Sequence, residues 1–220
     1  MSIVHMAAAS IAPVTWEEVV ARYAAVMDYT ASYEKEEMAI SGGETQHMRL
    51  SFRKPHDVRL EWLDEKGKVD QVAVYRHGFN DGKLIAHKSG MLGSLIGKVR
   101  LDPRDARALQ ESRHPITEVG LGYIIDRLEQ GSRHGLISVR RVVEEELDGQ
   151  PVVRFEFDVS TGASPVGVAG ARRITVWVDR AMTLPVKVEI LDAGGKALER
   201  HRYRNLRVNV GLPDSVFTLP

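Results

Sequence analysis

The sequence predicts an α+β protein built on a curved antiparallel β half-barrel. Apolar and polar residues alternate with a period of two along most of the chain, which is the pattern of strands with one buried face. Turn sequences such as Asp148-Gly149 and Gly194-Gly195 join neighbouring segments as hairpins. Helical periodicity occurs only near the N-terminus and in the middle of the chain. We expect about nine to eleven strands from the number of alternating segments.

The N-terminal helix is predicted over residues 15–29. Thr15 is a suitable N-cap, and Glu18 follows it three residues later, as in a capping box. Val19, Tyr23 and Val26 fall on one stripe of this helix, so we expect them to dock it against the sheet.

Most of the chain is predicted to be strand. In residues 45–53, Met48, Leu50 and Phe52 share one face, and the next segment places Val58, Leu60 and Trp62 on its apolar face. We expect Val72 and Val74 to continue this inward face. After residue 131 the predicted strands are 136–147, 152–159, where Phe155 and Phe157 point inward, 173–179, 184–191 and 196–209.

The middle of the chain has a different pattern. Residues 89–103 are apolar but carry Gly90, Gly93 and Gly97, which suit a loop or hinge better than a strand interior. Two helices are predicted next, over residues 102–109 and 116–128. We expect these helices to cover the concave face of the half-barrel.

Composition excludes several classes of function. Thirty basic and thirty acidic residues cancel without long blocks of one sign, which argues against a nucleic-acid partner. The absence of cysteine excludes disulfides and thiolate chemistry. No run approaches the ~20 apolar residues of a transmembrane helix. Residues 1–14 are interpreted as a leader remnant or a disordered N-terminus and residues 15–220 as one domain. A periplasmic or exported monomer is expected, with a cytoplasmic location as the alternative.

The sequence carries no recognisable cofactor, metal or catalytic motif, so we expect a protein that is not an enzyme, with neither a cofactor nor a metal site. The eight histidines lack the spacing of a zinc motif. The glycine-rich residues 161–171 precede a strand instead of opening a helix, which argues against a dinucleotide site. Ser94 lacks the context of a nucleophile elbow.

The segment Arg113-His114-Pro115 admits two interpretations. In the structural one, Pro115 and Gly120 shape the entry to the following helix. In the functional one, Arg113 and His114 bind the head group of a ligand or move a proton. A hydrolase using His114 with a carboxylate such as Glu118 or Asp126 is the enzymatic alternative.

Four segments, residues 27–37, 50–63, 101–122 and 184–217, resemble an uncharacterised bacterial family, number 1571 among the domains of unknown function. The last of these segments is also similar to the final strands of LolA-like periplasmic lipoprotein carriers. This resemblance implies an incomplete antiparallel barrel wrapped around helices that plug its hydrophobic concave face.

We therefore expect the concave face to bind a lipid or acyl chain, or an acylated protein, which would suit a carrier of lipids or lipoproteins in the bacterial envelope. The predicted ligand-contacting residues are Phe52, Leu60, Trp62, Val74, Phe155 and Phe157, beneath Leu95, Ile96, Tyr123 and Ile124. Two alternatives stay open. The inward residues could simply fill a core, or the chain could be an interaction or sensor domain that binds another envelope protein through an open sheet edge.

Overall fold

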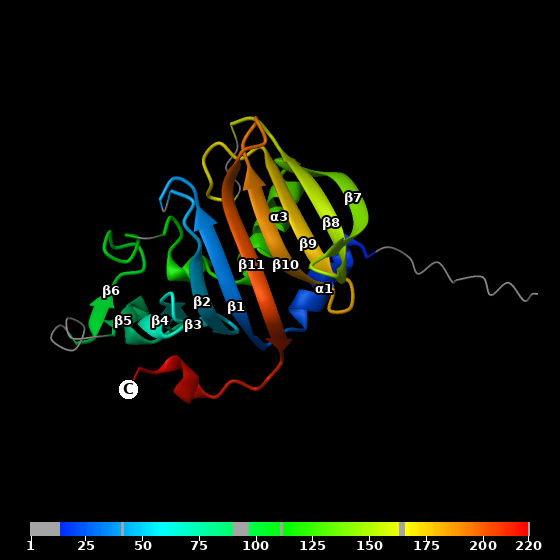
Figure 1. Cartoon of the computed structure of the whole chain (residues 1–220). Helices are drawn as coiled ribbons and strands as arrows, with labels where there is room; N and C mark the ends of the chain where they lie inside the picture. The colour runs from blue at the N-terminus through cyan, green and yellow to red at the C-terminus, as the bar shows by residue number, and fades with distance from the viewer. Residues whose placement is uncertain (1–13, 41, 90–96, 111, 163–165, 220) are drawn as a thin grey trace, which may run out of the picture.

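The chain forms one large antiparallel sheet in a computed structural model that describes residues 14–40, 42–89, 97–110, 112–162 and 166–219. Eleven strands follow the order β6-β5-β4-β3-β2-β1-β11-β10-β9-β8-β7, and every neighbouring pair is antiparallel. The sheet does not close, because β6 and β7 form its two ends (Figure 1). The predicted open antiparallel architecture and strand number are confirmed.

The sheet consists of two meanders that meet in the middle. The first contains β1 (Asp28–Glu37), β2 (Gln46–Arg53), β3 (Asp57–Leu63), β4 (Val69–Tyr75), β5 (Leu84–Lys88) and β6 (Val99–Leu101). The second contains β7 (Ile137–Leu147), β8 (Gln150–Val159), β9 (Arg173–Asp179), β10 (Leu184–Leu191) and β11 (Ala197–Val208). The pairing of β1 with β11 joins the two halves, so residues from opposite ends of the sequence meet at the centre.

Helix α1 (Trp16–Ala24) begins as predicted. The Thr15 side chain accepts a hydrogen bond from the Glu18 backbone N–H, and the Glu18 carboxylate accepts one from Thr15 N–H. Its buried residues include Val19 and Tyr23, and Trp16 packs edge-on against Phe155 and Phe157 with ring centroids 5.5 and 5.1 Å apart. Helix α1 therefore docks onto the second meander through aromatic contacts.

The two predicted helices in the middle of the chain differ from those observed. Residues 102–109 form turns instead of a helix. The side chains of Asp102 and Asp105 accept hydrogen bonds from the backbone N–H groups of Arg104 and Arg107 at 2.8 and 2.9 Å. Such local side-chain bonds compete with helical backbone bonding. Asp102, at the predicted start of the helix, and Asp105 therefore stabilise turns instead.

The predicted helix over residues 116–128 is broken near its start. Ile116–Glu118 form a single 3-10 turn, and α3 runs from Leu121 to Arg133. Between them Gly120 has a φ of +113°, outside the helical range. The Leu121 N–H donates to the Tyr29 hydroxyl on β1 at 2.8 Å, which fixes the start of α3 against the sheet.

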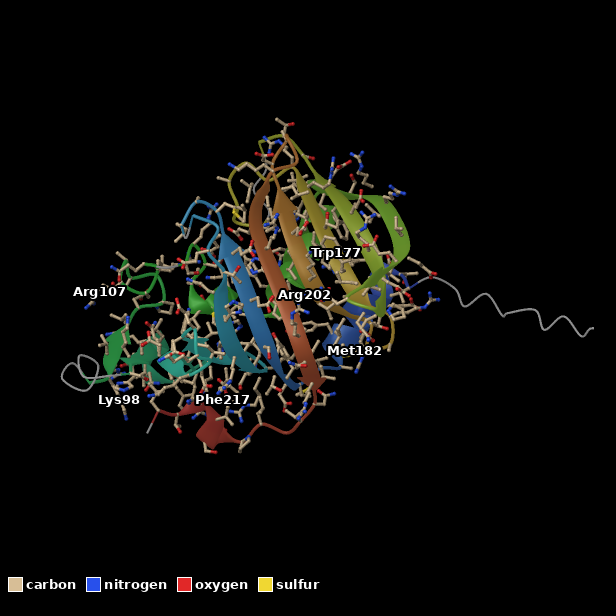
Figure 2. The ribbon with its side chains drawn as sticks, in the orientation of Figure 1. Lys98, Arg107, Trp177, Met182, Arg202 and Phe217 are labelled. Atoms are coloured by element: carbon tan, nitrogen blue, oxygen red, sulfur yellow. The ribbon has the colours of Figure 1, made fainter. Side chains whose placement is uncertain are left out.

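The sheet has an apolar face that forms the main core and an opposite face with two smaller clusters. On β4, Ala73 and Tyr75 belong to the main core, whereas Val72 and Val74 pack with Phe217 of the C-terminal 3-10 turn, η3 (Asp214–Phe217). Figure 2 shows Phe217 on this C-terminal segment. The prediction that Val74 faces inward is therefore wrong. The β3–β4 register places Ala73, not Val74, opposite Leu60.

The remaining short elements position turns. Residues Asn80–Gly82 form the 3-10 turn η1 before β5. The second outer cluster contains Val152, Trp177 and Val186, and the Lys187 ammonium lies 4.2 Å from the Trp177 ring centre. Within the part of the chain that the structure describes, no helix has the length and apolar character needed to span a membrane.

Candidate ligand-binding site

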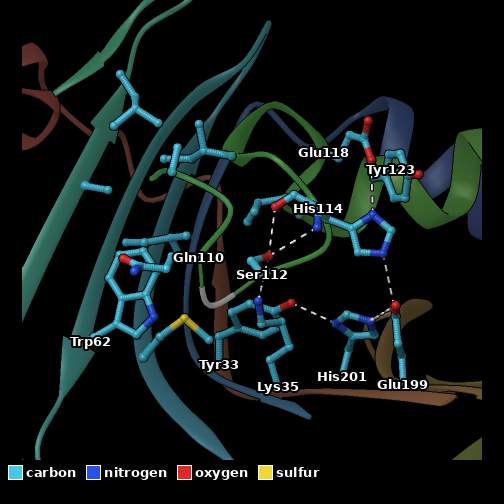
Figure 3. Close-up of a pocket in the computed structure, with 18 of the residues that line it drawn as sticks. Tyr33, Lys35, Trp62, Gln110, Ser112, His114, Glu118, Tyr123, Glu199 and His201 are labelled. Carbon is cyan, nitrogen blue, oxygen red and sulfur yellow. Dashed lines mark hydrogen bonds and ion pairs between the residues drawn. The ribbon is translucent and has the colours of Figure 1, made fainter. Parts of the chain in front are cut away.

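A partly open cavity of about 150 Å³ lies between the first meander, the central strands and the loop before α3 (Figure 3). We use this name for residues 102–110 and 112–120, which connect β6 to α3. The wall of the cavity is mostly apolar. The apolar and aromatic lining residues are Tyr33, Met48, Leu60, Trp62, Ala73, Leu84, Ala86, Leu101, Ala108, Ile116, Val119, Tyr123, Ile124, Val166, Val188, Ile190 and Tyr203. The cavity therefore sits where both halves of the sheet and the loop before α3 converge.

Small side chains on neighbouring strands help to create this space. Ala73 on β4 is paired with Leu60 on β3 on one side and with Ala86 on β5 on the other. Two adjacent alanines leave volume that larger residues would fill, and protein interiors normally leave few voids. The small side chains of β4 and β5 therefore leave part of the cavity volume unfilled.

One end of the cavity is polar, and its residues come from the central strand pair. The β1–β11 register places Tyr33 opposite Tyr203, Lys35 opposite His201, and Glu37 opposite Glu199. Glu37 and Glu199 are 1% and 0% exposed. We refer to Tyr33, Lys35, Glu37, Glu199, His201 and Tyr203 as the central ladder. Two buried carboxylates directly opposite each other require nearby positive charge.

The loop before α3 supplies part of that charge. His114 Nε2 lies 3.0 Å from Glu199 Oε2, and its Nδ1 lies 3.1 Å from Glu118 Oε2. Arg113 Nε lies 3.3 Å from Glu199 Oε1, and the Arg113 backbone N–H donates to Glu37 at 2.7 Å. The loop is therefore bound to the central ladder through both carboxylates.

Lys35 and Ser112 complete this polar end. Lys35 Nζ lies 3.3 Å from Glu37 Oε1 and donates to Ser112 Oγ at 2.9 Å. The Ser112 hydroxyl donates to the His114 carbonyl oxygen at 2.8 Å. His201 lies 2.7 Å from the Tyr33 hydroxyl through Nδ1 and 3.4 Å from Glu199 Oε2 through Nε2. Figure 3 shows these side chains converging beside the apolar part of the cavity.

The electrostatics of the cluster favour charged partners. Burial alone would raise the pKa of Glu199, but hydrogen bonds from His114 and His201 and their charges lower it to about 2. Burial alone would lower the pKa of His114, whereas its bonds to Glu199 and Glu118 raise it above the usual value. A carboxylate facing each ring nitrogen favours the imidazolium, which donates from both.

Comparison with models of protein families shows to which family this chain belongs. The family model described as "Protein of unknown function (DUF1571)" matches residues 26–219. The chain belongs to the DUF1571 family. The family resemblance expected from the sequence is therefore confirmed. The comparison with curated proteins gives no significant match.

Solved structures with TM-scores of 0.50 and 0.53 share the fold of this DUF1571 protein at low sequence identity. One chain of the MucA/MucB complex of Pseudomonas aeruginosa is 17% identical with a TM-score of 0.53, over 93% of this chain and 60% of that chain. LprF from Mycobacterium bovis is 10% identical with a TM-score of 0.50, over 93% and 96% of the two chains. A LolA superfamily protein from Nitrosomonas europaea is 9% identical with a TM-score of 0.34, over 94% and 99%. The DUF1571 chain thus spans 60% of the matched chain of the MucA/MucB complex.

The predicted ligand-contacting residues separate into those that line the cavity and those that do not. Leu60, Trp62, Tyr123, Ile124 and the head-group candidate His114 all line it. The structure brings these five residues together from β3, the loop before α3 and α3 itself. Their contact with a ligand stays a prediction.

The other predicted residues lie elsewhere. Phe52 stacks on Tyr29 in the core with ring centroids 5.0 Å apart, and Phe155 and Phe157 pack on Trp16. Arg113 pairs with Glu199 and is not part of the lining. Val74 faces the opposite side of the sheet, and Leu95 and Ile96 lie outside the described residues.

Sequence reasoning missed the central ladder. The sequence signal for the ladder is that every second residue of β1 faces inward, although these residues change from apolar to charged along the strand. The residues in question are all buried: Tyr29, Ala31, Tyr33, Lys35 and Glu37. On β11, Glu199 and His201 interrupt the inward row between Ala197 and Tyr203 in the same way. Inward charged residues at one end of two strands could have indicated a polar site, but only the register shows that the two strands are partners.

Three members of the cluster also have the spacing of metal ligands. Ligand atoms of Glu37, His114 and Glu199 all lie within 4.8 Å of one another. Lys35 and Arg113 already lie against these two carboxylates, and a divalent ion would have to compete with both cations and with the His114 proton. The charge balance therefore favours an internal ion-pair network over a metal centre.

Proposed function

We propose that this DUF1571 protein binds a hydrophobic group, such as an acyl chain, in the cavity between the sheet and the loop before α3. The observation that carries this proposal is an apolar wall that ends in a buried polar cluster. Ligand pockets typically combine such an apolar lining with a few placed polar groups. The helices and the loop are proposed to act as the cover of the concave face.

The volume of the cavity limits the ligand. An apolar cavity of about 150 Å³ in another protein binds benzene, and the cavity here has about the same volume. Burying about six methylenes would contribute about 5 kcal/mol before the costs of ordering are subtracted. A short acyl group therefore fits the space as it stands. A longer chain requires the loop of residues 102–110 to move, so affinity should stop rising with chain length once the space is filled.

The arrangement of His114 supports binding in preference to catalysis. Both ring nitrogens face carboxylates, so neither is available as a general base for a nucleophile. The Ser112 hydroxyl donates to a backbone carbonyl, and Lys35 lies against Glu37. Asp126, the other carboxylate in the hydrolase alternative, borders a different hollow beside Lys54. We therefore propose a non-enzymatic role.

Binding of a protein partner is the second candidate function. Strand β7 is the last strand of the sheet, so one of its edges is unpaired among the described residues. Val139 and Val142 on this strand are 52% and 44% exposed. Partner strands commonly add to such edges. The MucA/MucB complex shows that a protein with this fold is found with a protein partner. We also propose that the protein is periplasmic, has a single domain and is monomeric.

The experiment that tests the cavity fills it with protein atoms. Ala86→Leu and Ala73→Leu each place extra carbons in the wall that β4 and β5 contribute to the cavity. Binding of a short fluorescent acyl ester, measured by displacement, should weaken at least tenfold in these variants while the circular dichroism spectrum is unchanged. Ala193→Leu, on an exposed turn, is the control for added hydrophobicity. Unchanged displacement in both cavity variants would remove the cavity as the binding site, and β7 would become the leading candidate.

A further inference from the structure

The charges at the polar end of the cavity are compensated within the protein. Three carboxylates, Glu37, Glu118 and Glu199, face three cationic groups, Lys35, Arg113 and His114, at separations of 3.0 to 3.3 Å. An anionic head group would have to displace one of these carboxylates or lie beside all three. Either costs free energy, because a buried charge needs its own partner.

The cavity wall nevertheless carries a polar atom without a partner. The Trp62 indole Nε1 is buried and has no hydrogen bond among the described residues. The Trp62 side chain lines the cavity, and Figure 3 shows it beside Gln110 on the side away from His114. Indole N–H is a donor only, and a buried donor without an acceptor is unfavourable.

Two primary amides accompany this donor. Gln71 lies directly opposite Trp62 in the β3–β4 register, and Gln110 approaches from the loop before α3. All three side chains line the same cavity. These three side chains are uncharged hydrogen-bonding groups. Arg107, which also lines the cavity, is paired with Asp105 at 3.0 Å, and the end at His114 is occupied by internal ion pairs.

From this we infer the chemical class of the ligand: an acyl chain attached through a neutral carbonyl, as an ester or an amide, whose oxygen accepts the Trp62 Nε1–H bond. The inference rests on the proposed function and narrows it, because it excludes free fatty acids and phosphate head groups as the preferred ligands. It also assigns the recognition of the polar group to Trp62 in place of Arg113 and His114.

The test uses short probes that match the size of the cavity. Methyl hexanoate and N-methylhexanamide represent the ester and amide sources, hexanoate is the anion, and heptane lacks any polar group. Their affinities for the whole chain at neutral pH are measured by fluorescence displacement. The ester or the amide should bind at least about tenfold more tightly than hexanoate, and the stronger of the two identifies the source.

Indole N–H signals in proton–nitrogen correlation NMR follow the hydrogen bond directly. The chain has three tryptophans and so three indole signals, which Trp62→Phe and Trp177→Phe assign. The carbonyl probes should move the Trp62 signal downfield and heptane should not. The signals of Trp16, which packs on Phe155, and of Trp177, which donates to Glu145 on the outer face, should stay in place.

Trp62→Phe keeps an aromatic ring and removes the donor, so ester affinity should fall about three- to tenfold, as expected for one buried hydrogen bond, while heptane affinity is retained. If hexanoate binds the wild-type chain as tightly as the ester does, the inference is overturned. This comparison uses no variant, so it remains decisive even if Trp62→Phe does not fold. An ester that binds without moving the Trp62 signal would also overturn it and would leave cavity binding intact. If none of the four probes binds, the proposed function fails together with the inference.

Discussion

Glu37 and Glu199 lie directly opposite each other on β1 and β11, and both carboxylates are buried at the centre of the sheet. Neighbouring like charges in such a place are unfavourable unless cations compensate them. Lys35 supplies one cation from the same strand, and Arg113 and His114 supply two from the loop. The loop that borders the cavity is thus held by the electrostatic requirement of the strand pair that joins the two halves of the fold.

Stability should depend on pH through this contact. The folded-state pKa of Glu199 is about 2 against an ordinary 4.5, so its contribution is complete above pH 4.5 and is lost as the pH falls toward 2. The folded-state pKa of His114 is raised above 6.5, so its contribution is complete below pH 6.5 and is lost as the pH rises through the folded value. The pair therefore stabilises the fold most between pH 4.5 and 6.5.

Urea unfolding across the pH range measures these two limbs in variants. Glu199→Gln should remove the contribution of Glu199 to the acid limb, which is on the order of 3 kcal/mol for a shift of this size, and should lower stability throughout. Other carboxylates with a lowered pKa, such as Glu118, should leave a smaller acid limb in this variant. His114→Gln should flatten the alkaline limb. His47→Gln, at an exposed position on β2, should retain the wild-type profile. An alkaline limb that persists in His114→Gln would show that another group causes it.

Gly120 is expected to tolerate no side chain. Its φ of +113° is unfavourable for other residues, and a Cβ there would lie 2.6 Å from the Tyr29 hydroxyl oxygen and 3.2 Å from a Phe52 ring carbon. Gly120→Ala should destabilise the protein by about 2–4 kcal/mol, from backbone strain and overpacking.

Gly135→Ala separates these two causes. Gly135 also has a positive φ, +67°, but nothing lies within 4 Å of its added Cβ. This variant should lose only the backbone contribution, about 1–2 kcal/mol. Both free energies come from denaturant titration. If both variants lose the same free energy of unfolding, the added Cβ at residue 120 causes no measurable overpacking against Tyr29 and Phe52.

Ile124 and Phe157 should respond differently although both are apolar residues of the main core. Ile124 lines the cavity, so Ile124→Ala should enlarge it and shift the preferred methyl ester toward longer acyl chains by about two or three carbons. Phe157 packs on Trp16 away from the lining, so Phe157→Leu should lower stability and leave the chain-length preference unchanged. Displacement by a series of methyl esters measures both. The same shift in Phe157→Leu would place that residue in the binding site after all.

The strands could be predicted because their signal is local. Residues 173–179 and 184–191 are rich in β-branched residues and are bounded by turn residues, and both strands have the predicted limits. Val74 was assigned to the wrong face because residues 72–75 are all apolar and all buried, so alternation alone does not decide which of them point inward. Only pairing with β3 settles the question.

The site was less predictable than the fold for the same physical reason. His114 could be selected because it stands beside a proline in an unusual loop, but its partner Glu199 lies 85 residues away. The cavity arises from Ala73 and Ala86 being neighbours across two strands, which depends on register. The turns at residues 102–109 were mistaken for a helix because aspartates serve both as helix caps and as turn residues.

Asp28 is expected to hold the C-terminal segment against the sheet. Its carboxylate is buried and accepts hydrogen bonds from the backbone N–H groups of Val210 at 2.7 Å, Gly211 at 3.1 and 3.2 Å, and Leu212 at 3.0 Å. The segment then leads to Phe217, which covers Val72 and Val74.

Asp28→Asn keeps the shape of the side chain but replaces one acceptor oxygen with a donor that faces these N–H groups. It should therefore cost about 1–3 kcal/mol and increase hydrogen exchange at Val210 to Leu212. Limited proteolysis should cut first in residues 210–219. The matched control is Asp214→Asn, because the Asp214 side chain is 70% exposed and pairs with Arg53 and Arg76 at the surface of the same segment. Pairs made by an exposed carboxylate contribute little to stability, so the control should remain resistant to protease. If both variants are cleaved to a similar extent, the buried carboxylate of Asp28 holds the segment no more strongly than the exposed carboxylate of Asp214.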